Sequence, residues 1–162
     1  ALALWDTDFA GGYRQHANRP DDHPHAVLCF YDPYRKCLPY AVAWGMPFGS
    51  KSAPLNCSRV LRVLTFLAAR LFGICGIDCI DCIDDVNACE PKQTAPSALI
   101  AWKSFPGDII GFRFEGSKHG LGASLVIQGI LVDATSRELK LSIAPSRAVS
   151  LTQELDQVLA SA

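Results

Sequence analysis

Two adjacent carboxylates, Asp84 and Asp85, end an apolar run that extends from Leu71 to Ile83. An ionised carboxylate is costly to remove from water, so such a pair does not normally finish a buried strand unless a counter-charge meets it. A turn between two strands would let both side chains point into one cleft, where their hard oxygen atoms suit Mg²⁺. For this pair taken alone, a solvated Asp-Asp turn is the alternative.

A second acidic strand end lies near the N-terminus. A short apolar stretch, residues 1–5, runs into Asp6 and Asp8, and Tyr13 follows five residues after Asp8. A two-metal centre for in-line phosphoryl transfer holds its metal ions about 4 Å apart and draws carboxylates from separate strands. Two acidic strand ends far apart in the sequence are therefore compatible with such a centre.

Between the two acidic sites, residues 46–54 read Met-Pro-Phe-Gly-Ser-Lys-Ser-Ala-Pro, and an apolar-rich segment follows them. With the three pieces in this order, the chain resembles reverse transcriptases of the retrotransposon type. The segment from Asp8 to Tyr13 resembles their first catalytic motif, and residues 47–54 resemble the second. Residues 82–85 resemble the aromatic-x-Asp-Asp box, with Cys82 where the family usually has an aromatic residue.

Two further matches extend the resemblance over about residues 2 to 147. Lys118 resembles the lysine of the fourth motif, and residues 128–133 (Gln-Gly-Ile-Leu-Val-Asp) resemble a strand of the primer-grip hairpin. Each motif alone is weak evidence. Their common order and spacing favour the family.

The resemblance implies RNA-directed DNA synthesis by two-metal nucleotidyl transfer from a dNTP to a primer 3′-hydroxyl. Asp8 and Asp84 would hold Mg²⁺ (or Mn²⁺), with Asp85 as the supporting acid or, alternatively, a solvated turn residue. One metal ion would lower the pKa of the primer hydroxyl, and the other would hold the triphosphate. Lys118 would protonate the leaving pyrophosphate as a general acid, the alternative being an ordinary surface lysine.

Three further residues are expected to contact the incoming nucleotide. Tyr13 would lie beneath its sugar and exclude a 2′-hydroxyl, Gly49 would let the backbone approach it, and Phe48 would pack against it or the template. For the two aromatic residues, ordinary core packing is the alternative. Asp6 is interpreted as a plain strand-end acid, because only Asp8 has the family spacing to Tyr13.

The length, composition and net charge of the chain limit which class of protein it can be. The 162 residues suit one domain, and 49% hydrophobic with 19% charged residues indicates a globular chain without a membrane-spanning run. A net charge of −1 counts against a nucleic-acid-binding face, which is usually basic. That objection weakens if the chain is a palm whose acidic centre holds metal ions while other parts grip the duplex.

We therefore expect an α+β fold: a right-hand polymerase palm with an antiparallel sheet and helices packed on one face. Residues 1–147 would be a partial palm whose fingers lie upstream, and residues 148–162 would start a thumb or connecting helix. Expected strands are 2–8, 25–31, 37–43, 72–83, 86–89, 109–114, 124–132 and 138–143, with helices from about 52 to 71, at 96–105 and from about 150.

The expected partners are a primed RNA or DNA template, a dNTP, and fingers and thumb from the same polyprotein. We expect an intracellular location, in the cytoplasm or nucleus, and no membrane contact. The chain alone is expected to fold marginally and not to polymerise. The alternative function is a catalytically inactive remnant, or a nucleic-acid-binding module that keeps only the palm fold. Cys82 and the acidic composition favour that alternative.

The chain has seven cysteines, an odd number, and no recognisable secretory signal. Both observations argue against a full disulfide framework. Four of the cysteines crowd the acidic hairpin, at positions 75, 79, 82 and 89. Zinc binding is an alternative, but their spacing is not that of paired Cys-x-x-Cys knuckles. Buried structural thiols are the preferred interpretation.

Overall fold

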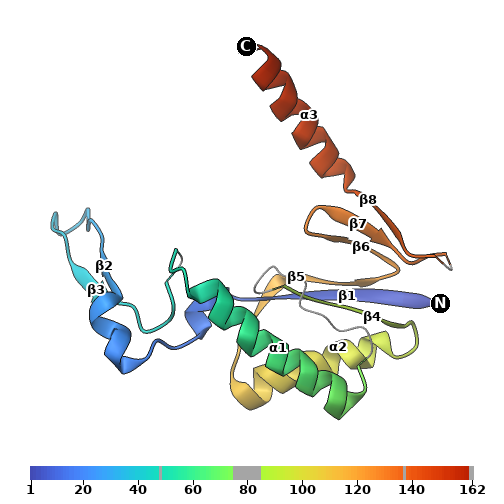
Figure 1. Ribbon diagram of the computed structural model, residues 1–162, viewed down its shortest axis with the longest axis horizontal. Helices are drawn as coiled ribbons and strands as arrows, with labels where there is room; N and C mark the ends of the chain where they lie inside the picture. Colours follow the sequence, from blue (N-terminus) through green and yellow to red (C-terminus); the bar gives the residue numbers. More distant parts are fainter. Residues whose placement is uncertain (48, 75–84, 137, 161–162) are drawn as a thin grey trace.

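The computed structural model describes residues 1–47, 49–74, 85–136 and 138–160. Its central element is a three-stranded antiparallel sheet in the order β4-β1-β5 (Figure 1). The strands are β1 (Leu2–Phe9), β4 (Asp85–Pro91) and β5 (Phe114–Gly122). β1 and β4 pair without interruption from Leu2 opposite Pro91 to Asp8 opposite Asp85, whereas the β1–β5 register shifts between Thr7 and Phe9.

Alternation along β1 divides its side chains between two faces of the sheet. Trp5 and Phe9 point toward the helices and enter the hydrophobic core with Trp102, which is fully buried. Thr7 lies on the same face, where its Oγ1 accepts a hydrogen bond of 2.9 Å from Trp102 Nε1. The polar indole and hydroxyl are therefore satisfied inside the core.

Two helices, α1 (Ala53–Phe72) and α2 (Ala95–Ser104), cover this face of the sheet (Figure 1). In α1, Pro54 occupies the first turn, where its missing N–H costs nothing, and Cys57, Leu61, Leu64 and Ala68 are buried at helical spacing. The helix ends at Gly73, which has a φ of 66°. The expected strand at 72–83 starts too early, because Phe72 is still helical; residues 75–84 lie outside the described residues.

The expected strand at 109–114 is wrong. After α2 the chain continues through a π-helical turn, η3 (Phe105–Ile110), which ends at Gly111 with a φ of 91°. Pro106 does not stop the helical path, because it stands in the first turn of this new segment. The strand begins only at Phe114 and continues to Gly122, beyond the range expected from the sequence.

A second antiparallel sheet lies on the other side of the β4-β1-β5 sheet from the helices (Figure 1). It consists of β6 (Ser124–Ile127), β7 (Ile130–Asp133) and β8 (Lys140–Ile143). The expectation of one strand over 124–132 is wrong, because Gln128 and Gly129 adopt φ values of 53° and 79° and form a tight hairpin turn.

Helix α3 (Pro145–Ala160) follows β8 and projects away from both sheets (Figure 1). It begins at Pro145, earlier than the expected start near residue 150, because proline fits the first position of a helix. None of the residues of α3 is buried.

Among the helices of the described ranges, none is long and apolar enough to cross a membrane.

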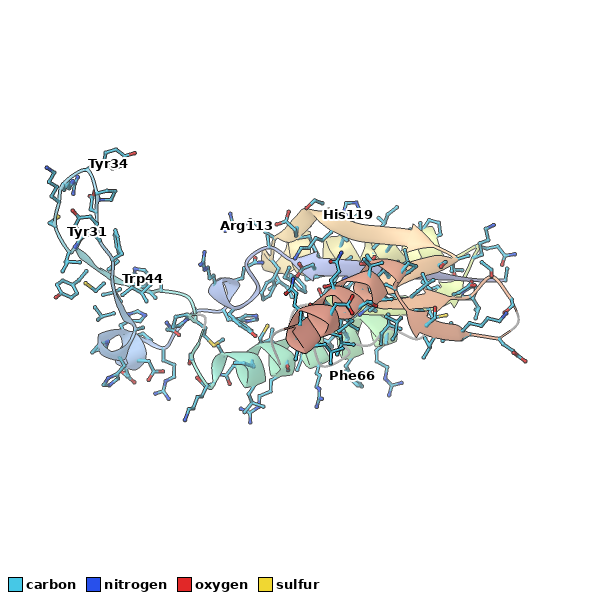
Figure 2. All side chains as sticks on the ribbon, turned by 90° about the horizontal axis from the view of Figure 1, so that it is seen from above. Tyr31, Tyr34, Trp44, Phe66, Arg113 and His119 are labelled. Atoms are coloured by element: carbon cyan, nitrogen blue, oxygen red, sulfur yellow. The ribbon has the colours of Figure 1, made fainter. Side chains whose placement is uncertain are left out.

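Residues 12–45 form an arm that extends beyond the end of the central sheet (Figure 1). It contains η1 (Gly12–Gln15), η2 (Pro20–His25) and a two-stranded sheet of β2 (Val27–Cys29) and β3 (Tyr40–Val42), both shorter than expected. Several aromatic side chains of the arm face solvent, among them Tyr31, Tyr34 and Trp44 (Figure 2). Together with the two sheets and helices, these elements give the α+β class predicted from the sequence.

Candidate active site

A row of polar side chains lies on the sheet face away from the helices. Asp6 and Asp8 alternate with the core residues of β1, so both belong to this face. The β1–β4 register places Asp85 directly opposite Asp8 and Asn87 directly opposite Asp6. Residues paired across antiparallel strands point to the same side. Sheet pairing thus brings two carboxylates together from positions far apart in the sequence.

Lys118 joins this row from β5. Its Nζ donates a hydrogen bond of 2.8 Å to Asp8 Oδ2. The Asp8 side chain is 10% exposed and the Lys118 side chain 67% exposed. The irregularity in the β1–β5 register lies next to this contact, since Thr7 pairs with His119 and Phe9 with Phe114. Such a bulge re-aims side chains, and here it accompanies the approach of Lys118 to Asp8.

The second Asp8 oxygen has a different environment. Oδ1 is buried and receives no hydrogen bond within the part of the chain that the structure describes. Asn87 Nδ2, two residues along β4 from Asp85, is likewise buried without a partner there. Buried polar atoms are normally satisfied, and exceptions concentrate at functional sites or at sites of an absent ion or water.

These residues line a cavity of about 400 Å³ between the two sheets. Its polar wall carries Asp6, Asp8, Asp85, Asn87 and the segment 117–120, and its apolar wall comes from β6. Gly120 allows the walls to approach, because a Cβ there would lie 2.7 Å from Asp6 Oδ1 and 2.8 Å from Leu125 Cδ2.

The structure therefore brings together Asp8, Asp85 and Lys118 of the predicted site residues. Tyr13 lies in η1 and packs against the edge of the hydrophobic core, and Gly49, with a φ of 90°, has open space around it. Neither lines the cavity. Phe48 and Asp84 lie outside the described residues.

Sequence reasoning missed Asn87, Gly120 and the place of Asp6 on the cavity wall. The two-residue alternation of side chains along a β-strand would have indicated Asn87 and Asp6. If Asp8 pairs with Asp85 in an antiparallel hydrogen-bonded pair, the residue two before Asp8 must face the residue two after Asp85. Asp6 lies on the cavity wall with the other two carboxylates.

The carboxylates of Asp8 and Asp85 meet part of the requirement for a metal ion. Mg²⁺ is commonly bound through one or two carboxylates together with water and substrate phosphates. Of the two Asp8 oxygens, Oδ2 already holds Lys118 Nζ at 2.8 Å, and Oδ1 is buried. Among the described residues, however, no group of three or more His, Cys, Asp or Glu side chains is arranged to hold a metal ion.

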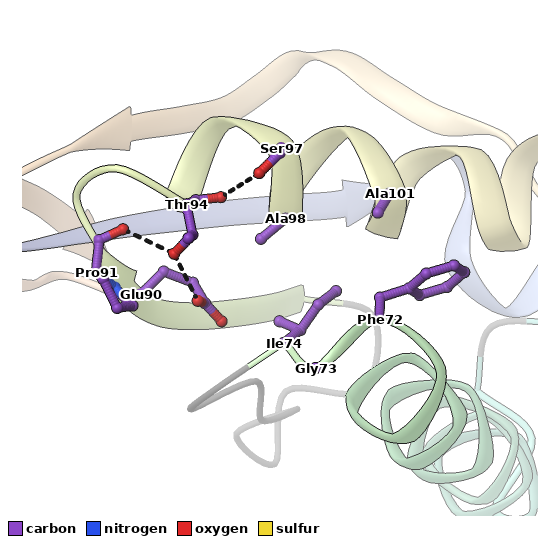
Figure 3. A pocket seen from close by; sticks show the side chains of 9 residues that line it. All are labelled: Phe72, Gly73, Ile74, Glu90, Pro91, Thr94, Ser97, Ala98 and Ala101. Atoms are coloured by element: carbon purple, nitrogen blue, oxygen red, sulfur yellow. Dashed lines mark hydrogen bonds between the residues drawn. The ribbon is translucent and has the colours of Figure 1, made fainter.

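A second cavity, of about 390 Å³, lies on the helix side between β4, α2 and the end of α1 (Figure 3). Thr94 Oγ1 donates to Glu90 Oε2 at 3.3 Å and lies 3.1 Å from the Pro91 carbonyl oxygen. Ser97 Oγ in turn donates to the Thr94 carbonyl oxygen (Figure 3). None of the predicted site residues lines this cavity, so it is separate from the carboxylate site.

None of the cysteines within the described ranges, Cys29, Cys37, Cys57 and Cys89, forms a disulfide bond. Cys57 is buried in α1, whereas Cys29 and Cys37 of the arm are exposed. Of the four hairpin cysteines interpreted as buried structural thiols, Cys89 is only half-buried. Burial raises the pKa of the Cys89 thiol, and the neighbouring Glu90 carboxylate raises it further. The remaining cysteines of the acidic hairpin, at positions 75, 79 and 82, lie outside the described residues.

No family model matches the chain, and no curated protein matches it in sequence. Two solved structures of foamy viral protease-reverse transcriptase do match in three dimensions. One, in complex with double-stranded DNA, has a TM-score of 0.66 over 85% of this chain; the other, in complex with an RNA/DNA hybrid, has a TM-score of 0.68 over 98%.

The chain has a reverse-transcriptase-like fold. Sequence identity to both structures is 16%, so the similarity concerns the fold alone. The chain spans about a fifth of the length of each of these proteins, 22% and 20%. The reverse-transcriptase-like domain therefore corresponds to one part of a much longer foamy viral chain.

Proposed function

We propose that this chain is the palm of an RNA-directed DNA polymerase from a retroelement. Residues 1–147 would form the palm, and residues 148–162 would lead into a thumb or connecting helix. The observation that carries the proposal is the cavity in which Asp8 faces Asp85 while Lys118 contacts Asp8. The reverse-transcriptase-like fold supports it. The resemblance of the segments around Asp8 and Asp85 to the family motifs supports it as well.

The proposed substrates are a dNTP and a primed RNA or DNA template. Both matching foamy viral structures are complexes with nucleic acid, which supports a nucleic-acid partner. Fingers and thumb from the same polyprotein would supply the basic contacts that a chain of net charge −1 lacks. We propose that the polymerase acts inside the cell, in the cytoplasm or nucleus.

Asp8 and Asp85, with Asp84 by sequence, would hold Mg²⁺ or Mn²⁺. When bound, the metal ions would lower the pKa of the primer 3′-hydroxyl and offset the charge of the triphosphate. The Asp8 side chain is 10% exposed, and charges interact more strongly where water is excluded. Lys118 carries a proton at Nζ beside these carboxylates and would donate it to the leaving pyrophosphate.

The proposed nucleotide contacts of Tyr13, Phe48 and Gly49 rest on the sequence motifs. Tyr13 and Gly49 precede α1 and lie away from the carboxylate cavity, so they would contact a nucleotide that extends beyond it. Substitution of Tyr13 by valine would then relax discrimination against ribonucleotides without removing incorporation.

Primer extension by the product of the complete open reading frame tests the proposal. With an RNA template, a DNA primer and Mg²⁺, we expect incorporation that Asp8→Asn and Asp85→Asn each reduce by about 10²- to 10³-fold, because each removes charge next to the reacting phosphate. Asp133→Asn is a matched control, since Asp133 is a half-buried aspartate of β7 that accepts a hydrogen bond from the Thr135 N–H and does not line the cavity. Its expected rate is that of the wild type.

The alternative is a nucleic-acid-binding module without catalysis, which the acidic composition favours. Retention of a labelled primed template without incorporation, in the wild type and in Asp8→Asn alike, would support the module and contradict the polymerase.

A further inference from the structure

The two oxygens of the Asp8 carboxylate differ in their burial and in their hydrogen-bond partners. Oδ1 is buried and has no partner in the described ranges, whereas Oδ2 holds the Lys118 ammonium group at 2.8 Å. Because Oδ1 is closed off from solvent, a cation that arrives from the cavity meets the carboxylate at Oδ2. Lys118 already occupies that oxygen.

The position of Lys118 has an electrostatic reason. Asp8 and Asp85 are register partners, and like charges directly opposite each other destabilise an antiparallel pair. Asp6 lies on the same cavity wall and adds a third acidic side chain to it. A lysine bonded to the most buried member of this group offsets its charge and stabilises the fold in the absence of metal.

The exposure of the Lys118 side chain lets it move away from Asp8. Its side chain is 67% exposed, against 10% for Asp8, and a lysine side chain is a flexible four-carbon chain with a strongly hydrated head. It comes from β5, on the opposite side of β1 from Asp85, so its departure leaves the β1–β4 pairing untouched.

We propose that Lys118 is a built-in counter-ion of Asp8 that a divalent cation must displace. The inference rests on the proposed role of Asp8 as a metal ligand. An ammonium nitrogen and a divalent ion on one carboxylate oxygen would lie within a few ångströms of each other and repel strongly. The ion pair and the metal are therefore mutually exclusive, and Lys118 stabilises the metal-free protein while lowering its affinity for metal.

Displacement would also couple metal binding to the next step. The released ammonium group would stay at the cavity wall, which Ser117 and His119 share with it, and could there meet the anionic phosphates of a bound nucleotide. Metal arrival would thus convert Lys118 from a partner of Asp8 into a partner of the substrate.

Mn²⁺ binding to the full 162-residue chain, measured by electron paramagnetic resonance of the free ion, tests this inference. We expect Lys118→Met, which keeps the length of the side chain but not its charge, to lower the Kd for Mn²⁺ by about 3- to 10-fold, the range of a partly exposed ion pair. The same variant should have a lower thermal midpoint in EDTA. A residue with a merely structural role would weaken both properties together.

Three further variants give the controls. Lys118→Arg keeps the cation and should leave the Kd for Mn²⁺ near that of the wild type. Lys140→Met removes an exposed lysine of β8 and should change neither property. Asp8→Asn should abolish the Mn²⁺ binding that Lys118→Met strengthens.

The outcomes separate the two proposals. Mn²⁺ binding that is lost in Asp8→Asn but unchanged or weakened in Lys118→Met would overturn the role of Lys118 and leave the metal site standing. Wild-type protein that binds no Mn²⁺, or binds it equally well in Asp8→Asn, would overturn both.

Discussion

At the scale of single residues, the site depends on a glycine as much as on its carboxylates. Gly120 lies opposite Asp6 in the β1–β5 register and leaves room for the Asp6 carboxylate and for Leu125 of the second sheet. The position needs a small side chain rather than an unusual backbone, because its φ lies outside the left-handed range that several other glycines adopt. The close approach of Asp6 and Leu125 at the cavity wall therefore depends on the missing Cβ of Gly120.

Gly120→Ala should lower the free energy of unfolding by about 1 kcal/mol, because its Cβ would press on Asp6 Oδ1 and Leu125 Cδ2. The contact itself costs about 1–3 kcal/mol, and the entropy that alanine removes from the unfolded chain offsets about 0.4–1 kcal/mol of that cost. Gly116→Ala in the same strand is the matched control, since nothing lies within 4 Å of its Cβ, and it should be neutral or slightly stabilising. Urea unfolding measures both, and equal midpoints for the two variants would contradict the tight contact at Gly120.

At the scale of elements, α1 and β1 were predictable from their apolar patterns, and β5, which has no such pattern, was not. The stripe from Cys57 to Ala68 specifies α1, and the apolar residues of β1 specify its core face. β5 reads Phe-Glu-Gly-Ser-Lys-His-Gly-Leu-Gly and shows no alternation. It is an edge strand that pairs with β1 through its backbone and needs no apolar side chains for this. Its sequence therefore did not predict a strand.

The same distinction applies to the site. Asp8, Asp85 and Lys118 were found from motif types and order, whereas Asn87 and Gly120 become visible only through the register of β1 with its neighbours. Register depends on pairing between distant segments, which a local pattern does not contain. Gln128 adopts a positive φ, which is rare for glutamine, so the sequence did not predict the turn between β6 and β7.

His16, at the junction of the arm and the core, gives the fold a pH dependence. Its side chain is buried against Phe112, with ring centroids 5.4 Å apart, and this burial lowers the pKa of the imidazole from its usual 6.5. A histidine with a lowered pKa in the folded state stabilises the fold above the unfolded pKa and loses that contribution as pH falls through and below 6.5. The free energy of unfolding should therefore decrease between pH 7 and pH 5.

His16→Gln should flatten this dependence, because it removes the group that must be protonated on unfolding. His25→Gln, at an exposed position of η2, is the matched control. Urea unfolding at several pH values gives the slope, and identical slopes for wild type and His16→Gln would assign the pH dependence to other groups.

At the scale of the whole molecule, burial is concentrated in one place. Trp5, Trp102 and Val86 are fully buried where the β4-β1-β5 sheet meets the helices. The arm (Figures 1 and 2) and α3 (Figure 1) project from this core and expose large apolar side chains, among them Tyr34 of the arm, which is 96% exposed. Exposed apolar surface of this extent is typical of a surface that another part of a protein covers.

Helix α3 should be the least stable helix of the isolated chain. All its residues are exposed or half-buried, including Val149, Leu155 and Val158, and a helix of 16 residues that buries none of its side chains is marginal in water. Its amide hydrogens should exchange within seconds, whereas those of β1 and β4 should exchange only on global unfolding. Hydrogen exchange followed by mass spectrometry over a dilution series measures this. Protection of α3 that fades on dilution would show self-association through the helix, and protection at every concentration would contradict the prediction, because it would require contacts within one chain that hold α3 in place.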